Sequence, residues 1–304
     1  MNAIIAGQWG TTRLQAFLIV NGAVVDEGTG PGAAQVRGSG FEEAFLALAA
    51  GWLETHPQAS ILLSGMVGSS FGWQDAGYVD CPARPADAVR HCAEIHSHGR
   101  IVRIVRGMAC TNIMGEPDVL RGEETELLGW QAHTPESEQG IHIVCIPGTH
   151  AKWVILRDGV VESFLTSAAG ELFAALGKEG ILTDGGNGAH APDVFRNAVG
   201  DAAGQGASLP HLLFTVRSRT VRGLMRHEDA ASRLSGLIIG ADVAGALRLI
   251  GGTVGVPERI AVIGMPELGA RYVDALNVLG VTASLMESRT ATIAGSQQAG
   301  GFLD

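Results

Sequence analysis

The chain has 304 residues, of which 46% are hydrophobic and 17% are charged. This length exceeds the size at which one hydrophobic core usually stops growing, and the charged share is below the roughly 25% of ordinary soluble domains, so we expect two folded domains and exclude a disordered chain. The formal net charge of −10 has the wrong sign for a protein that neutralises nucleic-acid phosphates. The 43 glycines have no three-residue period, so we expect them at turns, tight packing and ligand loops.

The first predicted elements are three short strands. Apolar runs at residues 3–8, 14–20 and 23–26 are separated by the turn Gly10-Thr11-Thr12 and by Asn21-Gly22, a dipeptide typical of type I′ hairpins. An apolar stripe with helical spacing predicts a helix over residues 41–54, and buried strands are expected at residues 61–63 and 101–105. The segment 118–130 is expected to be a helix that joins the two halves of the chain.

The second half repeats this order. Predicted strands at residues 141–146, 152–156 and 160–163 are separated by Gly148-Thr149 and Asp158-Gly159. Helices are expected at residues 171–176, 209–222, 230–250 and 267–279, with strands at 259–263 and 281–286. The two Gly-Thr turns are separated by nearly the same number of residues as the two hairpin turns, and an internal duplication explains this.

We therefore predict an α/β protein with two duplicated lobes. The N-terminal lobe is expected at residues 1–132 and the C-terminal lobe at 133–304, because residues 131–140 are polar and contain Pro135. No apolar stretch is long enough and free enough of charge to predict a membrane span, and no secretory signal is visible at the N-terminus, so we expect no membrane partner and a cytoplasmic location. The low share of charged residues leaves room for a homodimer.

Several motifs in order resemble one family. They are Gln8-Trp9-Gly10-Thr11-Thr12, Ser64-Gly65-Met66-Val67-Gly68-Ser69 with Gly72-Trp73, Arg121-Gly122-Glu123-Glu124-Thr125, and Pro147-Gly148-Thr149-His150 with Lys152-Trp153-Val154. Together they resemble the 2-dehydro-3-deoxygalactonokinases of the sugar kinase, Hsp70 and actin superfamily. The resemblance implies ribonuclease H-like lobes built from β-β-β-α units, with ATP and substrate in a cleft between them.

The implied reaction is transfer of the γ-phosphoryl group of ATP to the 6-hydroxyl of 2-dehydro-3-deoxy-D-galactonate, with Mg²⁺, in galactonate catabolism. A kinase for the gluco epimer is the alternative within the same class. Glycine turns expose backbone N–H groups to phosphate oxygens, and threonine hydroxyls add donors. The expected ATP and phosphate residues are Gly10, Thr11, Thr12, Gly148, Thr149, His150 and Lys152, and Gly264 occupies the place of the superfamily's adenosine loop.

The expected general base lies at the start of the linking helix. Glu123 is preferred by its motif position, and Glu124 is the substitute; both glutamates are also explained by the helix dipole alone. The sugar-acid pocket is expected to contain Arg121 together with residues after the strand 61–63, where α/β proteins usually bind ligands. The candidates there are Ser64, Met66, Gly68, Ser69 and Trp73. Core packing is the alternative for Met66 and Trp73, and a surface ion pair for Arg121.

One position departs from the family pattern. The family begins its first phosphate turn with an aspartate that helps to hold hydrated Mg²⁺, whereas this chain has Gln8. A neutral amide attracts a hard cation less than a carboxylate does. The alternative to an active kinase is therefore a catalytically degraded protein that binds nucleotide or sugar acid without turnover.

Overall fold

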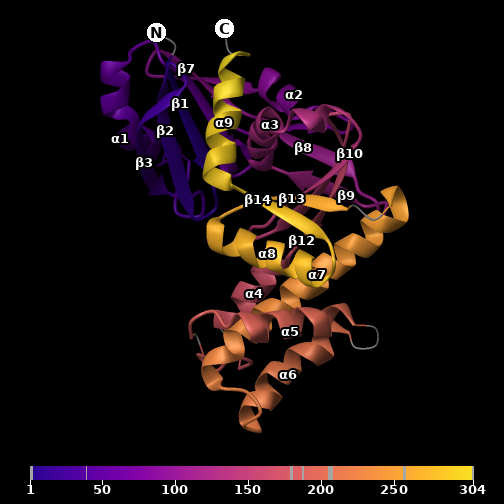
Figure 1. Ribbon diagram of the computed structural model, residues 1–304. Coiled ribbons are helices and arrows are strands. Elements are labelled where there is room, and N and C mark those ends of the chain that lie inside the picture. The colour runs from indigo at the N-terminus through magenta and orange to yellow at the C-terminus, as the bar shows by residue number, and fades with distance from the viewer. Residues whose placement is uncertain are drawn as a thin grey trace. The chain divides into compact units, whose positions relative to one another are not determined.

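The computed structural model describes residues 3–38, 40–178, 181–186, 188–204, 208–255 and 258–302 (Figure 1). The chain divides into two compact units. Unit 1 comprises Met1–Gly140, Leu156–Ser163 and Ser288–Asp304, and unit 2 comprises Ile141–Ile155 and Phe164–Glu287. The sequence places one boundary after residue 132, whereas each of these units is built from more than one segment.

The main sheet of unit 1 has the strand order β3-β2-β1-β4-β7-β6. Its strands are β1 (Ala3–Trp9), β2 (Arg13–Val20), β3 (Ala23–Pro31), β4 (Ser60–Gly65), β6 (Ala93–Ser97) and β7 (Arg100–Ile104). Strand β1 is antiparallel to β2 and parallel to β4. The predicted strands of the first half are confirmed, and β6 is an addition.

Alternate residues of β1 face opposite sides of this sheet. Ile5 and Trp9 belong to the core beneath helix α1 (Gly40–Thr55), where the rings of Trp9 and Phe41 lie 5.0 Å apart. Ile4 and Ala6 belong to a second cluster, on which Ile293 of helix α9 (Ser288–Gly300) packs. The helix predicted over residues 41–54 is confirmed.

A second, three-stranded sheet of unit 1 has the order β5-β8-β9. Its strands are β5 (Tyr78–Asp80), β8 (Gly107–Thr111) and β9 (Pro117–Leu120), and short helical elements are η1 (Met66–Gly68), α2 (Pro85–Arg90) and η2 (Pro135–Glu138). The prediction of one helix over residues 118–130 is wrong at its start. Residues 117–120 pair with β8, Gly122 has a φ of 108°, and helix α3 (Glu123–His133) begins only after it.

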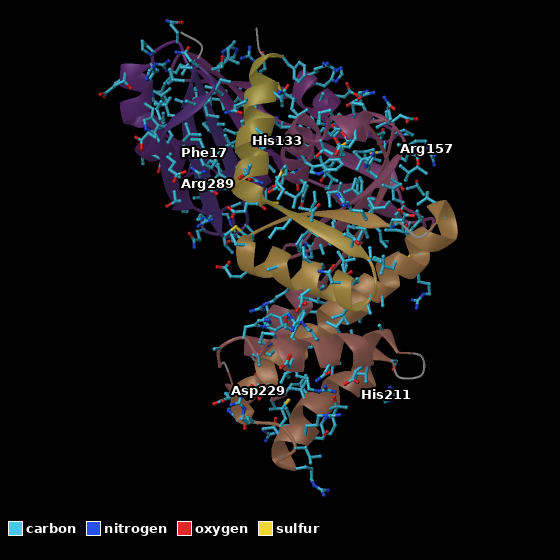
Figure 2. All side chains as sticks on the ribbon, viewed as in Figure 1. Phe17, His133, Arg157, His211, Asp229 and Arg289 are labelled. Carbon is cyan, nitrogen blue, oxygen red and sulfur yellow. The ribbon has the colours of Figure 1, made fainter. Side chains whose placement is uncertain are left out.

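Helices α3 and α9 pack with their backbones in close approach (Figure 1). A Cβ added at Gly129 would lie 1.8 Å from the carbonyl oxygen of Ala291, and one added at Gly295 would lie 1.9 Å from that of Thr125. Figure 2 shows Arg289 of α9 beside Phe17 of β2, over whose ring its guanidinium lies at 5.6 Å. The sequence did not predict α9, because its small and polar residues form no apolar stripe.

The second large sheet repeats the strand order of the first. It runs β12-β11-β10-β13-β14, which matches β3-β2-β1-β4-β7 position by position. The strands are β10 (Ile141–Ile146), β11 (Ala151–Arg157), β12 (Val160–Ser167), β13 (Arg259–Gly264) and β14 (Thr282–Glu287). Each sheet opens with three strands that are consecutive in the chain and are followed by a helix. The predicted α/β class and duplicated β-β-β-α units are confirmed.

The helices of unit 2 gather around one long helix, α7 (Ala230–Val254) (Figure 1). The others are α4 (Ala169–Lys178), α5 (Pro192–Ala203), α6 (Leu209–Val221) and α8 (Pro266–Val278), with the short η3 (His227–Asp229) before α7. In the described part of the chain, the segment His227–Val254 is long and apolar enough to cross a membrane by length and composition. Its packing against α4, α5, α6 and α8 explains this apolar character, because it is the core helix of unit 2.

Replacing Gly295 by alanine is expected to destabilise unit 1, because the new methyl group collides with the α3 backbone. Overpacking of this kind costs about 1–3 kcal/mol. Gly51→Ala in α1 is the matched control: no atom lies within 4 Å of the added Cβ, and alanine favours the helix by up to about 1 kcal/mol. Denaturant unfolding measures both variants. Equal stability of Gly295→Ala and the unmodified protein would contradict the close α3–α9 contact.

Candidate active site

The ends of two parallel strands and the start of a helix meet in unit 1. Strands β1 and β4 pair in a register that sets Gln8 beside Ser64 and Trp9 beside Gly65. A Cβ added at Gly122, just before α3, would lie 3.2 Å from the Cα of Gly65. The predicted motifs around residues 8, 64 and 122 are therefore brought together.

Arg121 lies against this junction. Its Nη2 donates to the carbonyl oxygen of Gly77 at 3.1 Å, and its guanidinium lies 4.4 Å from the centre of the Tyr78 ring. A Cβ at Gly68 would lie 2.9 Å from Nη1, so Gly68 gives the guanidinium its space. Nε and Nη1 are buried and have no hydrogen-bond partner among the described residues. These two contacts of Arg121 are to a carbonyl oxygen and to an aromatic ring.

The other predicted sugar-acid residues differ in their accessibility. Ser64 and Ser69 are buried, and Ser69 Oγ donates to the carbonyl oxygen of Met66 at 2.8 Å. Met66 is half-buried. Trp73 packs on the core of unit 1, with its ring 6.2 Å from that of Phe45. The core-packing alternative thus describes Trp73 well.

The two candidate bases occupy different environments in the first turn of α3. Glu123 is half-buried, and its Oε2 accepts from the backbone N–H of Arg121 at 2.8 Å. Glu124 is fully buried; its Oε2 accepts from the N–H of Gly122 at 2.6 Å, whereas its Oε1 has no partner among the described residues. Burial, together with the charge of Glu123, raises the pKa of Glu124 to about 8. Glu124 therefore holds a proton to higher pH than an ordinary glutamate does, and Glu123 is the more accessible carboxylate.

A third glutamate of α3, which the sequence analysis did not single out, contacts Gln8. Glu126 is 5% exposed and hydrogen-bonds to the side chains of Gln8 and Ser288. Burial and the charge of Glu123 raise its pKa to about 8, and these two hydrogen bonds oppose the rise. Thr292 Oγ1 donates to Gln8 Oε1 at 2.5 Å. The sequence did offer one indication that Glu126 is buried: it directly precedes Leu127 and Leu128, two apolar residues that are themselves buried.

The two Gly-Thr turns are built alike. After β3, the N–H groups of Ala33 and Ala34 donate to the carbonyl oxygens of Gly10 and Thr11. After β12, the N–H of Glu171 donates to the carbonyl oxygen of Thr149 in the same way. Thr11 and Thr12 are exposed, as are Thr149 and His150. The duplication thus extends from the turns to the segments that cover them.

In each case, the segment that covers the Gly-Thr turn touches it through a glycine. A Cβ at Gly32 would lie 2.1 Å from the carbonyl carbon of Thr12, and a Cβ at Gly170 would lie 2.2 Å from the carbonyl oxygen of Gly148.

Two predicted phosphate residues have partners inside unit 2. His150 Nε2 lies 2.7 Å from Glu171 Oε2, and the buried Lys152 donates from Nζ to Thr166 Oγ1 at 2.9 Å.

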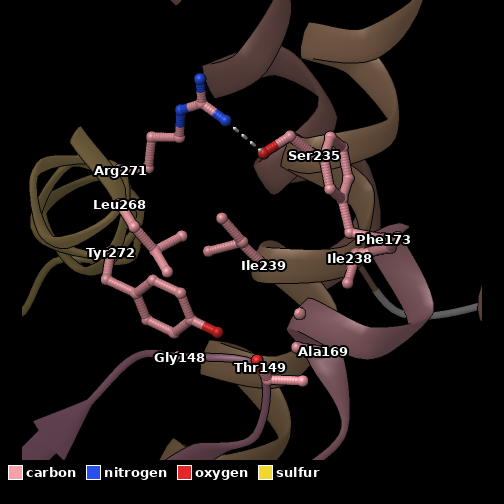
Figure 3. Close-up of a pocket in the computed structure, with 11 residues that line it drawn as sticks. Gly148, Thr149, Ala169, Phe173, Ser235, Ile238, Ile239, Leu268, Arg271 and Tyr272 are labelled. Carbon is pink, nitrogen blue, oxygen red and sulfur yellow. Dashed lines mark hydrogen bonds between the residues drawn. The ribbon is translucent and has the colours of Figure 1, made fainter. Parts of the chain in front are cut away.

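A cavity of about 250 Å³ adjoins the second turn. Its walls come from the turn and from α4, α7 and α8, and the lining residues are Gly148, Thr149, Ala169, Gly170, Phe173, Ser235, Ile238, Ile239, Leu268, Arg271 and Tyr272. Figure 3 shows Gly148 and Thr149 at one end, and Arg271 at the other end with its Nη1 3.5 Å from Ser235 Oγ. The site prediction included only Gly148 and Thr149 from this set, because the walls come from helices distant in sequence.

Tyr272, which forms part of the cavity wall, is hydrogen-bonded to a buried carboxyl group. Asp242 accepts from the Tyr272 hydroxyl at 2.7 Å and from Trp153 Nε1 at 3.1 Å. Burial raises the pKa of Asp242. Gly264 is not among the cavity residues; a Cβ there would lie 3.0 Å from Pro147 Cγ. Helix α8, rather than Gly264, therefore contributes this wall.

These features fit ATP better than a metal cage. The cavity is mainly apolar and ends at a Gly-Thr turn, and the start of α4, where Gly170 has no side chain, lines it. Within the described ranges, no three His, Cys, Asp or Glu side chains converge to hold a metal ion. Mg²⁺ bound with nucleotide usually takes most of its ligands from phosphate and water.

Two sheets of one strand order, each with a β-β-β-α unit and a covered Gly-Thr turn, define the sugar kinase fold of the Hsp70 and actin superfamily. Within that class, residues 8–299 match the 2-keto-3-deoxy-galactonokinase family. The chain belongs to this family and is a phosphotransferase with an alcohol group as acceptor.

The relatives match over nearly their whole length. A Rhizobium meliloti (strain 1021) protein described as a 2-dehydro-3-deoxygalactonokinase is 35% identical over 95% of this chain and 94% of its own. The 2-dehydro-3-deoxygalactonokinase of Escherichia coli (strain K12) is 30% identical over 96% and 95%. A crystal structure of a Sinorhizobium meliloti protein described as such a kinase superposes with a TM-score of 0.86 at 32% identity, covering 97% of both chains.

The raised pKa of Glu124 predicts a pH dependence of stability. Between its ordinary value of 4.5 and about 8, the folded state holds a proton that the unfolded chain releases. The free energy of unfolding should therefore fall as pH rises through this range, by up to about 1.4 kcal/mol per pH unit for such a group. Denaturant unfolding from pH 5 to 9 should show a shallower slope for Glu124→Gln. The exposed Glu54→Gln is the control, and an unchanged slope in Glu124→Gln would contradict the assignment.

Proposed function

We propose that the protein is an ATP- and Mg²⁺-dependent kinase that phosphorylates the 6-hydroxyl of 2-dehydro-3-deoxy-D-galactonate. The observation that carries the proposal is the apolar cavity that ends at the Gly148-Thr149 turn, in a chain of this family. The substrate follows from the names of the relatives in Rhizobium meliloti and Escherichia coli. We also propose a cytoplasmic location, where ATP is available. A homodimer is compatible with the low share of charged residues in the chain.

The cavity of unit 2 is proposed to hold the adenosine. Ile239, Leu268 and Tyr272 offer apolar surface to a purine ring, and Arg271 supplies a planar guanidinium that stacks on aromatic rings. The phosphates would then lie at the opposite end, beside Thr149, where backbone N–H groups of the turn and the start of α4 serve as donors. Gly10, Thr11 and Thr12 are assigned the corresponding role in unit 1, whereas the engaged Nζ of Lys152 makes it a weaker candidate.

The sugar acid is proposed to bind at the junction of β4 and α3. A guanidinium with unpartnered nitrogens is suited to a carboxylate, because the two can form paired, charge-assisted hydrogen bonds. Arg121 is therefore assigned to the substrate carboxylate. Ser64, near the end of β4, is assigned to the sugar chain together with Met66 and Ser69, which follow β4. Trp73 supports them from the core.

Glu123 is proposed as the general base. It accepts the proton of the 6-hydroxyl while the oxygen bonds to the γ-phosphorus and the bond to the ADP oxygen breaks. Its accessibility supports this role, whereas Glu124 is enclosed and its Oε2 is bonded to the Gly122 N–H. Mg²⁺, when bound, neutralises charge on the phosphates. Gln8 would face its hydrated shell through the amide oxygen that also accepts from Thr292.

The reaction class is tested by ADP release from the purified protein with ATP, Mg²⁺ and a panel of 2-keto-3-deoxy sugar acids. We expect the highest kcat/KM with 2-dehydro-3-deoxy-D-galactonate. A preference for the gluco epimer would correct the substrate. Nucleotide binding by calorimetry without ADP release from any acid would favour the degraded, binding-only protein that the neutral Gln8 suggests, and would contradict the proposal.

The two glutamates are separated by isosteric substitution. Glu123→Gln should lower kcat by about 10²–10⁴-fold with little change in KM for ATP, because the amide cannot accept the proton. Glu124→Gln should lower kcat by much less, since the Glu124 carboxyl group is buried and bonded to the Gly122 N–H. Steady-state kinetics at saturating sugar acid measure both, and a larger loss in Glu124→Gln would move the base by one residue.

A further inference from the structure

The side chain of Gln8 has a defined orientation. Residues alternate along β1, so Gln8 faces the same side of the sheet as Ile4 and Ala6, the side on which α9 packs. Its Oε1 accepts from Thr292 of α9 at 2.5 Å. The amide N–H₂ is then the group available to Glu126 of α3, with which Gln8 also hydrogen-bonds. One amide therefore joins β1 to two helices.

Glu126 is satisfied by matching donors. Ser288, the first residue of α9, and Gln8 both hydrogen-bond to its carboxyl group, which is almost entirely shielded from solvent. A buried polar group without such partners costs about 1–3 kcal/mol, so the identities at positions 8 and 126 depend on each other. An acid at both positions would set two carboxyl groups in contact, and an amide at both would leave a single acceptor oxygen at position 126 for the two partners Gln8 and Ser288.

We propose that Gln8 and Glu126 form one interdependent amide–carboxyl pair, in which Glu126 is a positioning residue that holds Gln8 beside the first phosphate turn. The turn Gly10-Thr11-Thr12 follows Gln8 by a single residue, so the orientation of Gln8 sets the start of the turn. The pair accounts for an amide at position 8, since its partner already carries the acid. The effect on nucleotide binding rests on the proposed kinase function, whereas the pairing itself does not.

An isosteric exchange tests the pair. Gln8→Glu creates two acids, Glu126→Gln creates two amides, and the double variant Gln8→Glu/Glu126→Gln restores one of each without changing the number of side-chain atoms. We expect Gln8→Glu to lower the Tm by about 5 °C or more and the double variant to recover most of that loss. Gln8→Glu/Glu54→Gln is the control and should not recover it, because the Glu54 side chain is exposed on α1.

Calorimetry with a non-hydrolysable ATP analogue and Mg²⁺ tests the positioning role. Each single variant should bind the analogue about tenfold or more weakly, and the double variant should regain affinity to within about threefold, as expected for loss and recovery of one hydrogen-bonded pair. Independent, additive losses in Tm and affinity would overturn the proposal. So would rescue of Tm without any change of affinity in the single variants, which would leave the pair purely structural.

Two further outcomes are also decisive. If Gln8→Glu does not fold, a folded double variant still supports the pair, and failure of both while Glu126→Gln folds contradicts it. Absence of kinase activity in the unmodified protein would remove the proposed function but not the Tm comparison, so the two failures are distinguishable.

Discussion

Close backbone approach at glycine is the constraint on which the structure depends. Helices α3 and α9 meet where a Cβ at Gly129 or Gly295 would lie less than 2 Å from a carbonyl oxygen. This contact brings Thr292 and Ser288 to Gln8 and Glu126, so the polar network of unit 1 exists only because no side chain separates the two helices. Alanine is already too large at these positions, and overpacking of this kind costs about 1–3 kcal/mol.

The same constraint shapes both Gly-Thr turns. Gly32 and Gly170 cover them from equivalent places, each after the third strand of its unit. The covering segments use their N–H groups to bind carbonyl oxygens of the turns, which holds each turn while its threonine stays exposed. A rigid loop with exposed donors binds phosphate without first paying the entropy of ordering. Duplication therefore preserved a complete unit of strand, turn, hairpin and covering glycine.

The sequence predicts the strands and most helices because apolar periodicity and hairpin glycines report local structure. It places the start of the linking helix too early, since the strand pairing of residues 117–120 with β8 is non-local. Helix α9 has no apolar stripe, and its burial follows from small residues packed on α3. Motifs identified Gly148 and Thr149, but Ile239 and Arg271 join them only through the packing of α7 and α8. Glu126 was missed because hydrogen bonding of a buried acid depends on partners far away in the chain.

The central claim is that the nucleotide binds in the cavity beside Gly148 and Thr149. The family indicates that a nucleotide is used, and the cavity gives its proposed position. A crystal structure with a non-hydrolysable ATP analogue tests it most directly. We expect the purine among Ile239, Leu268 and Tyr272, near Arg271, and phosphate oxygens within hydrogen-bond distance of the Gly148-Thr149 backbone. A nucleotide bound elsewhere, with this cavity empty, would contradict the account.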